Sequence, residues 1–164
     1  MILTYIISYN ASKHLQCGGV ERKEDDSMEF IVKEEITKKD KDDIFQGLLK
    51  YNLERLEDKK PRELGIFLND ENGEKVAGII CDTHGKWLLI HYLWVDETQR
   101  GKNIGSQLLM RAEEEAKSRG CEFSFVDTFD FQAPGFYMKH GYKEVFQLKN
   151  YPIKGTRFYY TKEI

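Results

Sequence analysis

The segment from Val95 to Ser106 holds the residues whose types and spacing best suit chemistry. An apolar run ends at Val95, a glycine-bearing loop follows, and a helical pattern begins at Ile104. The first amides of a helix lack partners within the helix, and together with the helix dipole they attract anions. Arg100 and Lys102 add positive charge at the same place. The segment predicts a phosphate-binding loop, and the plain alternative is an ordinary strand-to-helix turn.

Two common nucleotide-binding patterns do not fit this loop. The G-x-x-x-x-G-K-[ST] pattern is absent, because Asn103 follows Lys102 and no glycine precedes Gly101 at the required spacing. The dinucleotide pattern G-x-G-x-x-G is absent as well. If the loop binds a phosphate, it does so in another way.

A second segment, Thr128–Tyr142, carries a Phe136–Tyr137 pair on an expected short helix. A tyrosine hydroxyl can act as a general acid when it lies beside a leaving group. On its own, such an aromatic pair more often packs in a core. Its place after a strand–loop–helix unit favours the catalytic interpretation over core packing.

Both segments resemble the GNAT superfamily, the Gcn5-related N-acetyltransferases. The family signature [Q/R]-x-x-G-x-[G/A] is matched by Arg100–Gly105, with Asn103 in place of the middle glycine. Asn tolerates left-handed backbone angles better than most residues, so the loop can keep its shape. The second segment is similar to the family's a-x-x-F-Y-x-x-x-G-[F/Y] stretch. With the elements around them, the two segments span roughly Trp87 to Phe146, over a third of the chain.

The resemblance implies an N-acetyltransferase that moves the acetyl group of acetyl-CoA to an amine by direct attack through a tetrahedral intermediate, without a metal. The acceptor is an unidentified small-molecule or peptide amine. Tyr137 would protonate the departing thiolate. The alternative is a catalytically silent acyl-CoA-binding sensor on the same fold. The expected coenzyme-binding residues are Leu93, Trp94, Val95, Arg100, Gly101, Lys102, Asn103, Ile104, Gly105, Ser106, Thr128, Gln132, Ala133, Phe136 and Tyr137.

The base that takes the proton of the acceptor amine is less defined by the sequence. His91 is one candidate, because an ordinary histidine titrates near neutral pH. A histidine within an apolar strand is also often a hydrogen-bonded core residue. Asp96, Asp127 and Asp130 lie near the expected site, and a chain of water molecules could serve equally well.

The elements that must position these residues alternate along the chain. Helical spacing runs from an N-cap at Thr37 toward Pro61, and again from residue 104 to Gly120. A third, short helix is expected at 132–139. Strands are expected at 30–32, 64–68, 75–81, 87–95, 122–128, 142–147 and 157–162, with a turn at 82–85. The pattern predicts an α/β fold, or α+β with a mixed sheet, that has helices on both faces. The resemblance implies that this is the GNAT acyl-CoA N-acyltransferase fold.

Composition and charge set the wider expectations. The chain has 164 residues, which suits one domain: we expect an N-terminal extension over 1–27 that acetyl transfer does not need, and the N-acetyltransferase domain over 28–164. The formal net charge of -3 argues against general nucleic-acid binding. The apolar start is too short to span a membrane and does not resemble a signal peptide, so a cytoplasmic protein is expected.

Three separate cysteines favour reduced thiols over a disulfide framework or a zinc site. Cys81 and Cys121 stand in apolar surroundings and are expected to be small buried hydrophobic residues, with a nucleophilic Cys81 as the alternative. A possible homodimer is expected from the family and from the aromatic strand 157–160, whose free edge would be costly to expose.

Overall fold

The computed structural model describes residues 30–57 and 60–164. They fall in two compact units that divide between Glu54 and Arg55. The expected boundary between 27 and 28 lies outside the described residues. No helix among the described residues is long and apolar enough to cross a membrane.

The first unit contains helix α1 (Lys38–Leu53). Thr37 caps it as expected: the amide of Asp40 donates to Thr37 Oγ1 over 3.1 Å, and the amide of Thr37 donates to Asp40 Oδ2 over 3.0 Å. These two bonds satisfy donors that the first helical turn leaves open. The strand expected at 30–32 is wrong, because these residues are exposed and pair with no strand among the described residues. An extended segment needs a partner for its backbone groups to become a strand.

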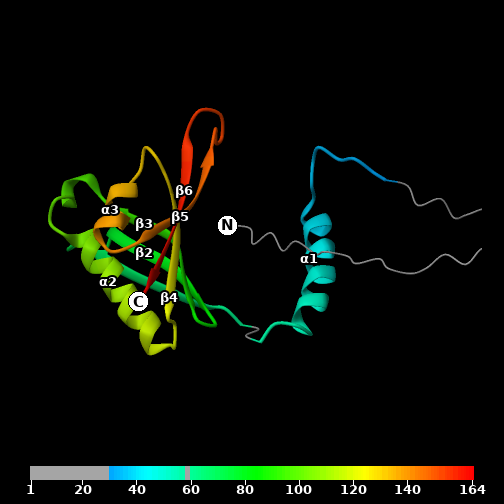
Figure 1. The fold of residues 1–164 in the computed structure, drawn as a ribbon, viewed down its shortest axis with the longest axis horizontal. Coiled ribbons are helices and arrows are strands. Elements are labelled where there is room, and N and C mark those ends of the chain that lie inside the picture. Colours follow the sequence, from blue (N-terminus) through cyan, green and yellow to red (C-terminus); the bar gives the residue numbers. More distant parts are fainter. Residues whose placement is uncertain (1–29, 58–59) are drawn as a thin grey trace, which may run out of the picture. The chain divides into compact units, whose positions relative to one another are not determined.

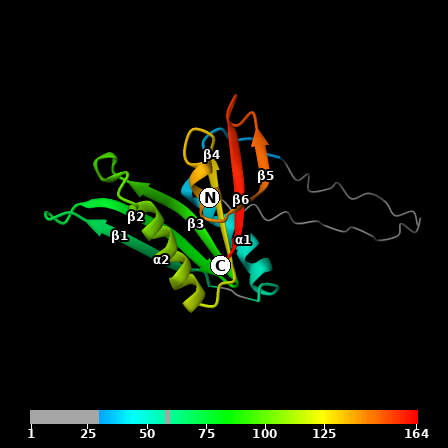
Figure 2. The same ribbon diagram turned by 60° about the vertical axis from the view of Figure 1, so that its left-hand side comes forward.

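The second unit is built on a six-stranded mixed sheet in the order β1-β2-β3-β4-β6-β5 (Figures 1 and 2). Only β3 and β4 pair in parallel, and the other neighbours are antiparallel. The mixed sheet with helices that the sequence predicts is confirmed. The strands are β1 (Arg62–Asn69), β2 (Lys75–His84), β3 (Trp87–Val95), β4 (Phe123–Phe129), β5 (Lys143–Lys149) and β6 (Thr156–Glu163).

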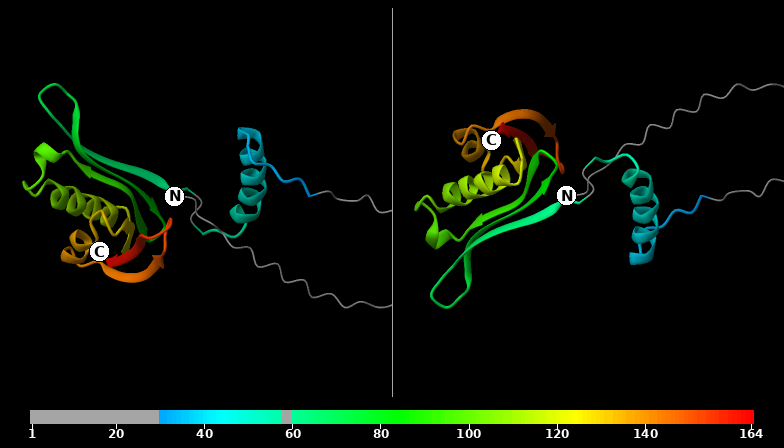
Figure 3. Two further views of the ribbon diagram at one scale, coloured as in Figure 1. Left: turned by 90° about the horizontal axis from the view of Figure 1, so that it is seen from above. Right: turned by 90° about the horizontal axis from the view of Figure 1, so that it is seen from below.

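Helices α2 (Ile104–Ser118) and α3 (Pro134–Lys139) belong to the same unit, and α2 lies along one face of the sheet (Figure 3). The buried core joins that face to both helices. Because α1 lies in the other unit, the sheet unit itself carries its helices on one face. The core residues are Leu64, Ala77, Ile79, Cys81, Leu88, Ile90, Leu108, Leu109, Ala112, Ala116, Cys121, Val126, Tyr137, Tyr142 and Tyr160.

Strands β3 and β4 are paired only along the first half of their length and then diverge. Their pairing runs from Trp87 opposite Phe123 to Ile90 opposite Val126 and then stops, although both strands continue. Figure 2 shows the two strands diverging. From His91 onward, β3 keeps its partner β2 on one side and has no strand on the other among the described residues. We call this opening the fork.

Two expectations about the strands are wrong in detail. The turn expected at 82–85 is shorter, because β2 continues to His84 and pairs there with Trp87. The final strand β6 is not an edge, because it lies between β4 and β5. The argument for a dimer from a free edge of this strand therefore fails.

A buried polar cluster ties α2 to the sheet. Glu113 is a carboxylate on an amphipathic helix, a type of residue that usually faces water, but it is only 7% exposed. Its carboxylate accepts from the Tyr142 hydroxyl over 3.0 Å and from Lys162 Nζ over 2.6 Å. The Tyr142 hydroxyl also lies 2.7 Å from Ser124 Oγ. A buried carboxylate needs such partners, and here they come from β6 and from the residue before β5, whose hydroxyl is held in turn by Ser124 of β4.

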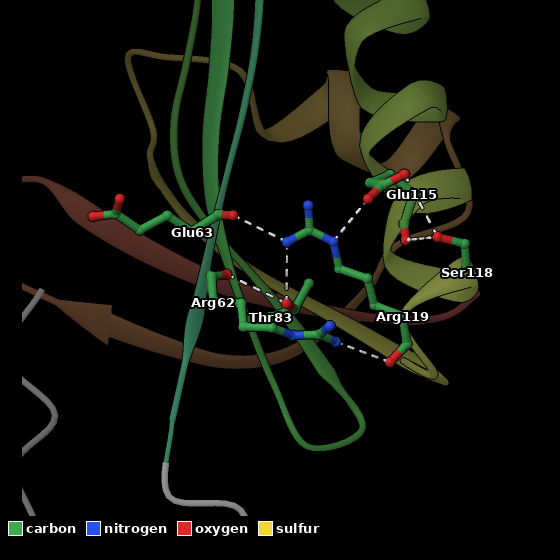
Figure 4. A network of polar contacts seen from close by, with 6 residues as sticks. All are labelled: Arg62, Glu63, Thr83, Glu115, Ser118 and Arg119. Atoms are coloured by element: carbon green, nitrogen blue, oxygen red, sulfur yellow. Dashed lines mark hydrogen bonds and ion pairs between the residues drawn. The ribbon is translucent and has the colours of Figure 1, made fainter.

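A second cluster fastens the far end of α2 to strands β1 and β2 (Figure 4). Arg119 donates from Nη1 to the Glu63 carbonyl over 3.0 Å and from Nε to Glu115 over 2.8 Å. Its own carbonyl accepts from Arg62 Nη2 over 3.1 Å. Thr83 joins the cluster through a 3.5 Å contact to Arg119 Nη1. One side chain thus joins three elements.

Replacing Arg119 with Ala is expected to lower the free energy of unfolding by about 1–3 kcal/mol, because it leaves partly buried partners without their donor. Urea denaturation measures the change. Arg111→Ala is the matched control on the same helix, since Arg111 is exposed and should matter by no more than about 0.5 kcal/mol. Equal stability of the two variants would show that the cluster in Figure 4 does not hold α2.

Candidate active site

A cavity of about 460 Å³ opens where β3, α2 and α3 meet. Its walls come from the end of β3, the loop after it, the start of α2, and α3. β3 contributes the apolar residues Leu93 and Val95, and the loop contributes mainly polar residues and one glycine. The lining residues are Leu93, Val95, Gln99, Arg100, Gly101, Asn103, Ile104, Gly105, Ser106, Ala133, Phe136 and Tyr137.

The loop between β3 and α2 is held by its own polar groups. Asp96 caps the short 3-10 helix Glu97–Gln99 by accepting from the Thr98 amide over 2.9 Å and from its hydroxyl over 2.6 Å. These bonds keep the pKa of Asp96 below its usual range. Arg100 Nε donates to the Val95 carbonyl over 3.3 Å. The loop is therefore fixed at both its start and its middle.

The start of α2 is suited to an anion. Asn103 precedes the helix with φ 61° and ψ 15°. It therefore adopts the left-handed backbone conformation expected of a residue at the glycine position of the signature. Its side chain makes no capping hydrogen bond. The amides of the first helical turn point along the axis and have no partner inside the helix. They are available to a phosphate group, with the helix dipole in support.

Two glycines leave space for a ligand at the start of α2. Gly101 has φ 78°, a conformation that side chains rarely adopt. Gly105 lies in the first turn of α2, and a Cβ built there would stand 3.6 Å from the Phe136 ring and 3.8 Å from Val95. A methyl group fits at residue 105, whereas a longer side chain would extend into the cavity.

Tyr137 of α3 lines the same cavity. Its ring is 6% exposed and packs edge-on against Phe136 and Tyr142, with centroids 5.2 Å and 5.6 Å away. Its hydroxyl donates to no group among the described residues, and it is not sealed from solvent. Burial raises the pKa of Tyr137 to about 12, and the charge of Asp127 adds to the shift. The hydroxyl is a protonated donor at neutral pH.

Most of the residues expected to bind a coenzyme line this cavity, and four do not. Lys102 Nζ instead donates to Gln99 over 2.8 Å. Thr128 and Gln132 hold the turn after β4, where Gln132 Oε1 accepts from Thr128 Oγ1 over 3.1 Å. The Trp94 side chain is half-exposed. The sequence did not single out Gln99, which also lines the cavity; it lies in the same loop, directly before the first signature residue Arg100, and that position could have indicated it.

His91 lies at the base of the fork, on a bulge of β3. Its Nε2 is 2.7 Å from Asp82 Oδ2 on β2, and its side chain is 19% exposed. The bulge falls between the pairs Ile80–Tyr92 and Cys81–Ile90. This extra residue turns the imidazole toward Asp82, which fixes the ring through one nitrogen. His91 does not line the cavity.

The cysteine expectation is confirmed for the two cysteines in the described residues. Cys81 and Cys121 are free and buried. Burial raises the pKa of Cys81 to about 12. Such a thiol is protonated at neutral pH and has no access to a substrate, so the nucleophilic alternative is not supported.

Comparison with known proteins gives one consistent family. Residues 26–142 match the sequence model of the acetyltransferase (GNAT) family. A blasticidin-S acetyltransferase of Streptomyces morookaense is 41% identical over 95 residues, which span 57% of this chain and 70% of the relative.

Solved structures agree with the fold described above. A crystal structure of an acetyltransferase from Bacillus cereus has a TM-score of 0.74 at 31% identity, with 82% of this chain and 98% of that chain covered. An aminoglycoside 6'-N-acetyltransferase, solved with coenzyme A, has a TM-score of 0.55 at 22% identity. That alignment covers 62% of this chain and 72% of the other, and it is a likeness of fold.

Proposed function

Because this chain belongs to the GNAT acetyltransferase family, we propose that it transfers the acetyl group of acetyl-CoA to an amino group of a small molecule. The observation that supports this most is the arrangement of one cavity. The same cavity is lined by a helix N-terminus suited to phosphate and by Tyr137, whose hydroxyl is a protonated donor. An acyl-CoA has the matching order of groups, with phosphates at one end and a thioester at the other.

The residues have separate parts in this proposal. The amides of Ile104, Gly105 and Ser106 bind the pyrophosphate at the start of α2. The unpaired side of β3, including Leu93 and Val95, faces the pantetheine arm and supplies backbone groups for the thioester carbonyl. Ala133 and Phe136 line the apolar wall between them.

The chemistry needs one proton donor and one acceptor. The amine nitrogen forms a bond to the thioester carbon, and the carbonyl electron pair moves to oxygen. When that pair returns, the C–S bond breaks, and the electrons leave on sulfur. Tyr137 gives its proton to the sulfur, and solvent restores it. The nitrogen loses its extra proton to His91, whose ring Asp82 holds in place. No metal and no covalent acyl-enzyme takes part.

The acceptor is proposed to be a small-molecule amine, in keeping with the named substrate of the blasticidin-S acetyltransferase. A fold hosts many activities, so the acceptor has to come from measurement. Blasticidin S, an aminoglycoside, a polyamine and a short peptide represent the main classes of amine.

Acetyl-CoA consumption in the presence of these amines tests the proposal. At least one class should release CoA thiol well above the rate without amine, with acetylated product seen by mass spectrometry. His91→Gln should then lower the turnover number by about 100-fold. A turnover number that His91→Gln leaves unchanged would move the base to water. Binding of CoA without turnover of any amine would instead favour a silent acyl-CoA-binding module.

A further inference from the structure

A mostly buried ion pair stands at the fork on the β4 side. Asp127 is the first residue of β4 after the last pair with β3. Along β4, Ser124, Val126 and Thr128 are buried in the core, so Asp127 points to the opposite face of the sheet. His91 is the corresponding first residue on β3. The two side chains therefore flank the opening between the strands.

The contacts of Asp127 are one-sided. Both Arg157 Nε and Arg157 Nη2 lie 2.6 Å from the same oxygen, Asp127 Oδ2. Within residues 30–57 and 60–164, Oδ1 has no hydrogen-bond partner, and no fully buried polar side-chain atom lacks one. Oδ1 is therefore open to a ligand, although the whole side chain is only 14% exposed. The carboxylate is held by one oxygen and free at the other.

Arg157 is too well surrounded to serve a substrate itself. Its guanidinium carbon lies 5.5 Å from the Phe129 ring centroid, 5.6 Å from that of Tyr151 and 5.8 Å from that of Tyr159. Cation–π contacts and the bond to Asp127 use its charge within the protein. The pair thus presents a carboxylate oxygen to the fork, and the cation stays behind it.

The position of Asp127 relates it to the reaction. Its charge acts on Tyr137, which lies across the sheet in the cavity. Asp127 follows Val126, which packs in the same core as Tyr137, and it borders the fork where the thioester is proposed to lie. As an amine attacks a carbonyl, its nitrogen gains positive charge, and a fixed carboxylate stabilises that charge.

We propose that Asp127 Oδ1 binds the amino group of the acceptor at the fork, and that the site therefore selects amines without an acidic group beside the nitrogen. The proposal rests on the acetyl transfer proposed above. Asp127 accepts an N–H hydrogen bond from the amine and stabilises the charge that grows on nitrogen. The surplus proton then leaves the nitrogen through His91 to solvent. An acceptor carboxylate or phosphonate would face Asp127 and be repelled.

Three pairs of amines that differ by one carboxylate test the selectivity: agmatine and arginine, tyramine and tyrosine, histamine and histidine. For the wild-type chain, kcat/KM should be at least about tenfold higher for the member without the carboxylate, since like charges at a binding site are strongly disfavoured. Asp127→Asn should lower kcat/KM for that member and bring the ratio toward one. It also leaves Arg157 uncompensated, so the acidic member gains.

Two further variants make the result specific. Asp127→Glu keeps the charge and should keep the preference. Glu122→Gln removes one carboxylate next to the other end of β4, where the side chain is 53% exposed, and should behave as wild type. Melting temperature and CoA affinity, measured for every variant, separate a lost fold from a lost subsite. An unchanged ratio in Asp127→Asn, or a wild-type preference for the acidic members, would overturn the proposal.

A binding measurement separates this proposal from the proposed function. Calorimetric titration of each amine into the complex of the chain with CoA needs no turnover. Agmatine, tyramine or histamine binding that is lost in Asp127→Asn, with no acetylated product, would support the subsite and count against acetyl transfer. Equal turnover by Asp127→Asn and wild type would support the transfer and reject the subsite. Absence of both binding and turnover for all six amines would also reject the subsite.

Discussion

Tyr137→Phe is expected to lower the turnover number by about 10²- to 10⁴-fold, which is the usual contribution of general acid catalysis. The affinity for CoA should stay nearly unchanged. The substitution removes one oxygen and keeps the ring, whose contacts with Phe136 and Tyr142 hold it in place. Steady-state kinetics with the best acceptor from the amine screen measure the effect.

The size of this effect follows from the acidity of the two groups. The pKa of Tyr137 is raised to about 12, whereas an ordinary thiol has a pKa of about 8.5. Full proton transfer to a free thiolate is therefore uphill, and donation has to accompany C–S cleavage. The raised pKa also keeps the hydroxyl protonated, so Tyr137 itself should cause no loss of activity as pH rises until pH nears about 12.

Tyr160→Phe is the matched control for the loss of one hydroxyl. Tyr160 is 1% exposed and stacks on Tyr137 at 6.5 Å, but it does not line the cavity. Its variant should turn over within about twofold of wild type, because surrounding contacts are kept and no reacting group is removed. If Tyr137→Phe matched Tyr160→Phe while chemistry limits the rate, the thiolate would take its proton from water.

Gly105→Glu is expected to weaken CoA binding by about 100-fold or more, because opposed like charges cost several kcal/mol at a binding site. The new carboxylate would extend from the first turn of α2 toward the position proposed for the pyrophosphate. The helix should still form, since Glu is a better helix former than Gly and an acidic group suits the helix N-terminus. Calorimetric titration with CoA measures the loss.

Gly105→Ala separates charge and length from the loss of glycine. Its Cβ would stand at ordinary contact distance from Phe136 and Val95, at 3.6 Å and 3.8 Å. CoA affinity should therefore stay close to wild type. Gly101→Glu should also abolish binding, but there the left-handed backbone adds strain. If Gly105→Glu bound CoA as wild type does, the start of α2 would not be the phosphate site.

Local patterns in the sequence were sufficient to predict the cavity's frame. An apolar strand, a loop with glycines and an amphipathic helix each have a periodicity that short-range physics sets, and they gave β3, the loop and α2. Asn103 shows the same point at one residue: the sequence indicated that it tolerates left-handed angles, and its φ in the structure is 61°. The elements that depend on residues close in sequence were therefore predicted correctly.

Contacts between residues far apart in the sequence were not predicted. Glu113 looked like a surface residue because its partner Lys162 is 49 positions away and only the fold brings them together. The placement of β6 between β4 and β5 has no local signal either. The pair of His91 with Asp82 arises from a bulge, which one sequence does not reveal. Asp127 was noted as a nearby acid, but its link to Arg157 required the register of β4 with β6.

The Glu113 cluster connects α2 to the aromatic packing around Tyr137. Glu113 belongs to α2, whose first turn is proposed to hold the phosphates, and Tyr142 belongs to the aromatic packing around the proton donor. One carboxylate thus links the anchor of the coenzyme to the acid that acts on its far end. The Glu113 cluster therefore holds the proposed phosphate site and the proton donor at a fixed separation. Acceptor preference can change on the opposite face of the sheet without changing that separation, whereas a shift of α2 would misplace the acid as well.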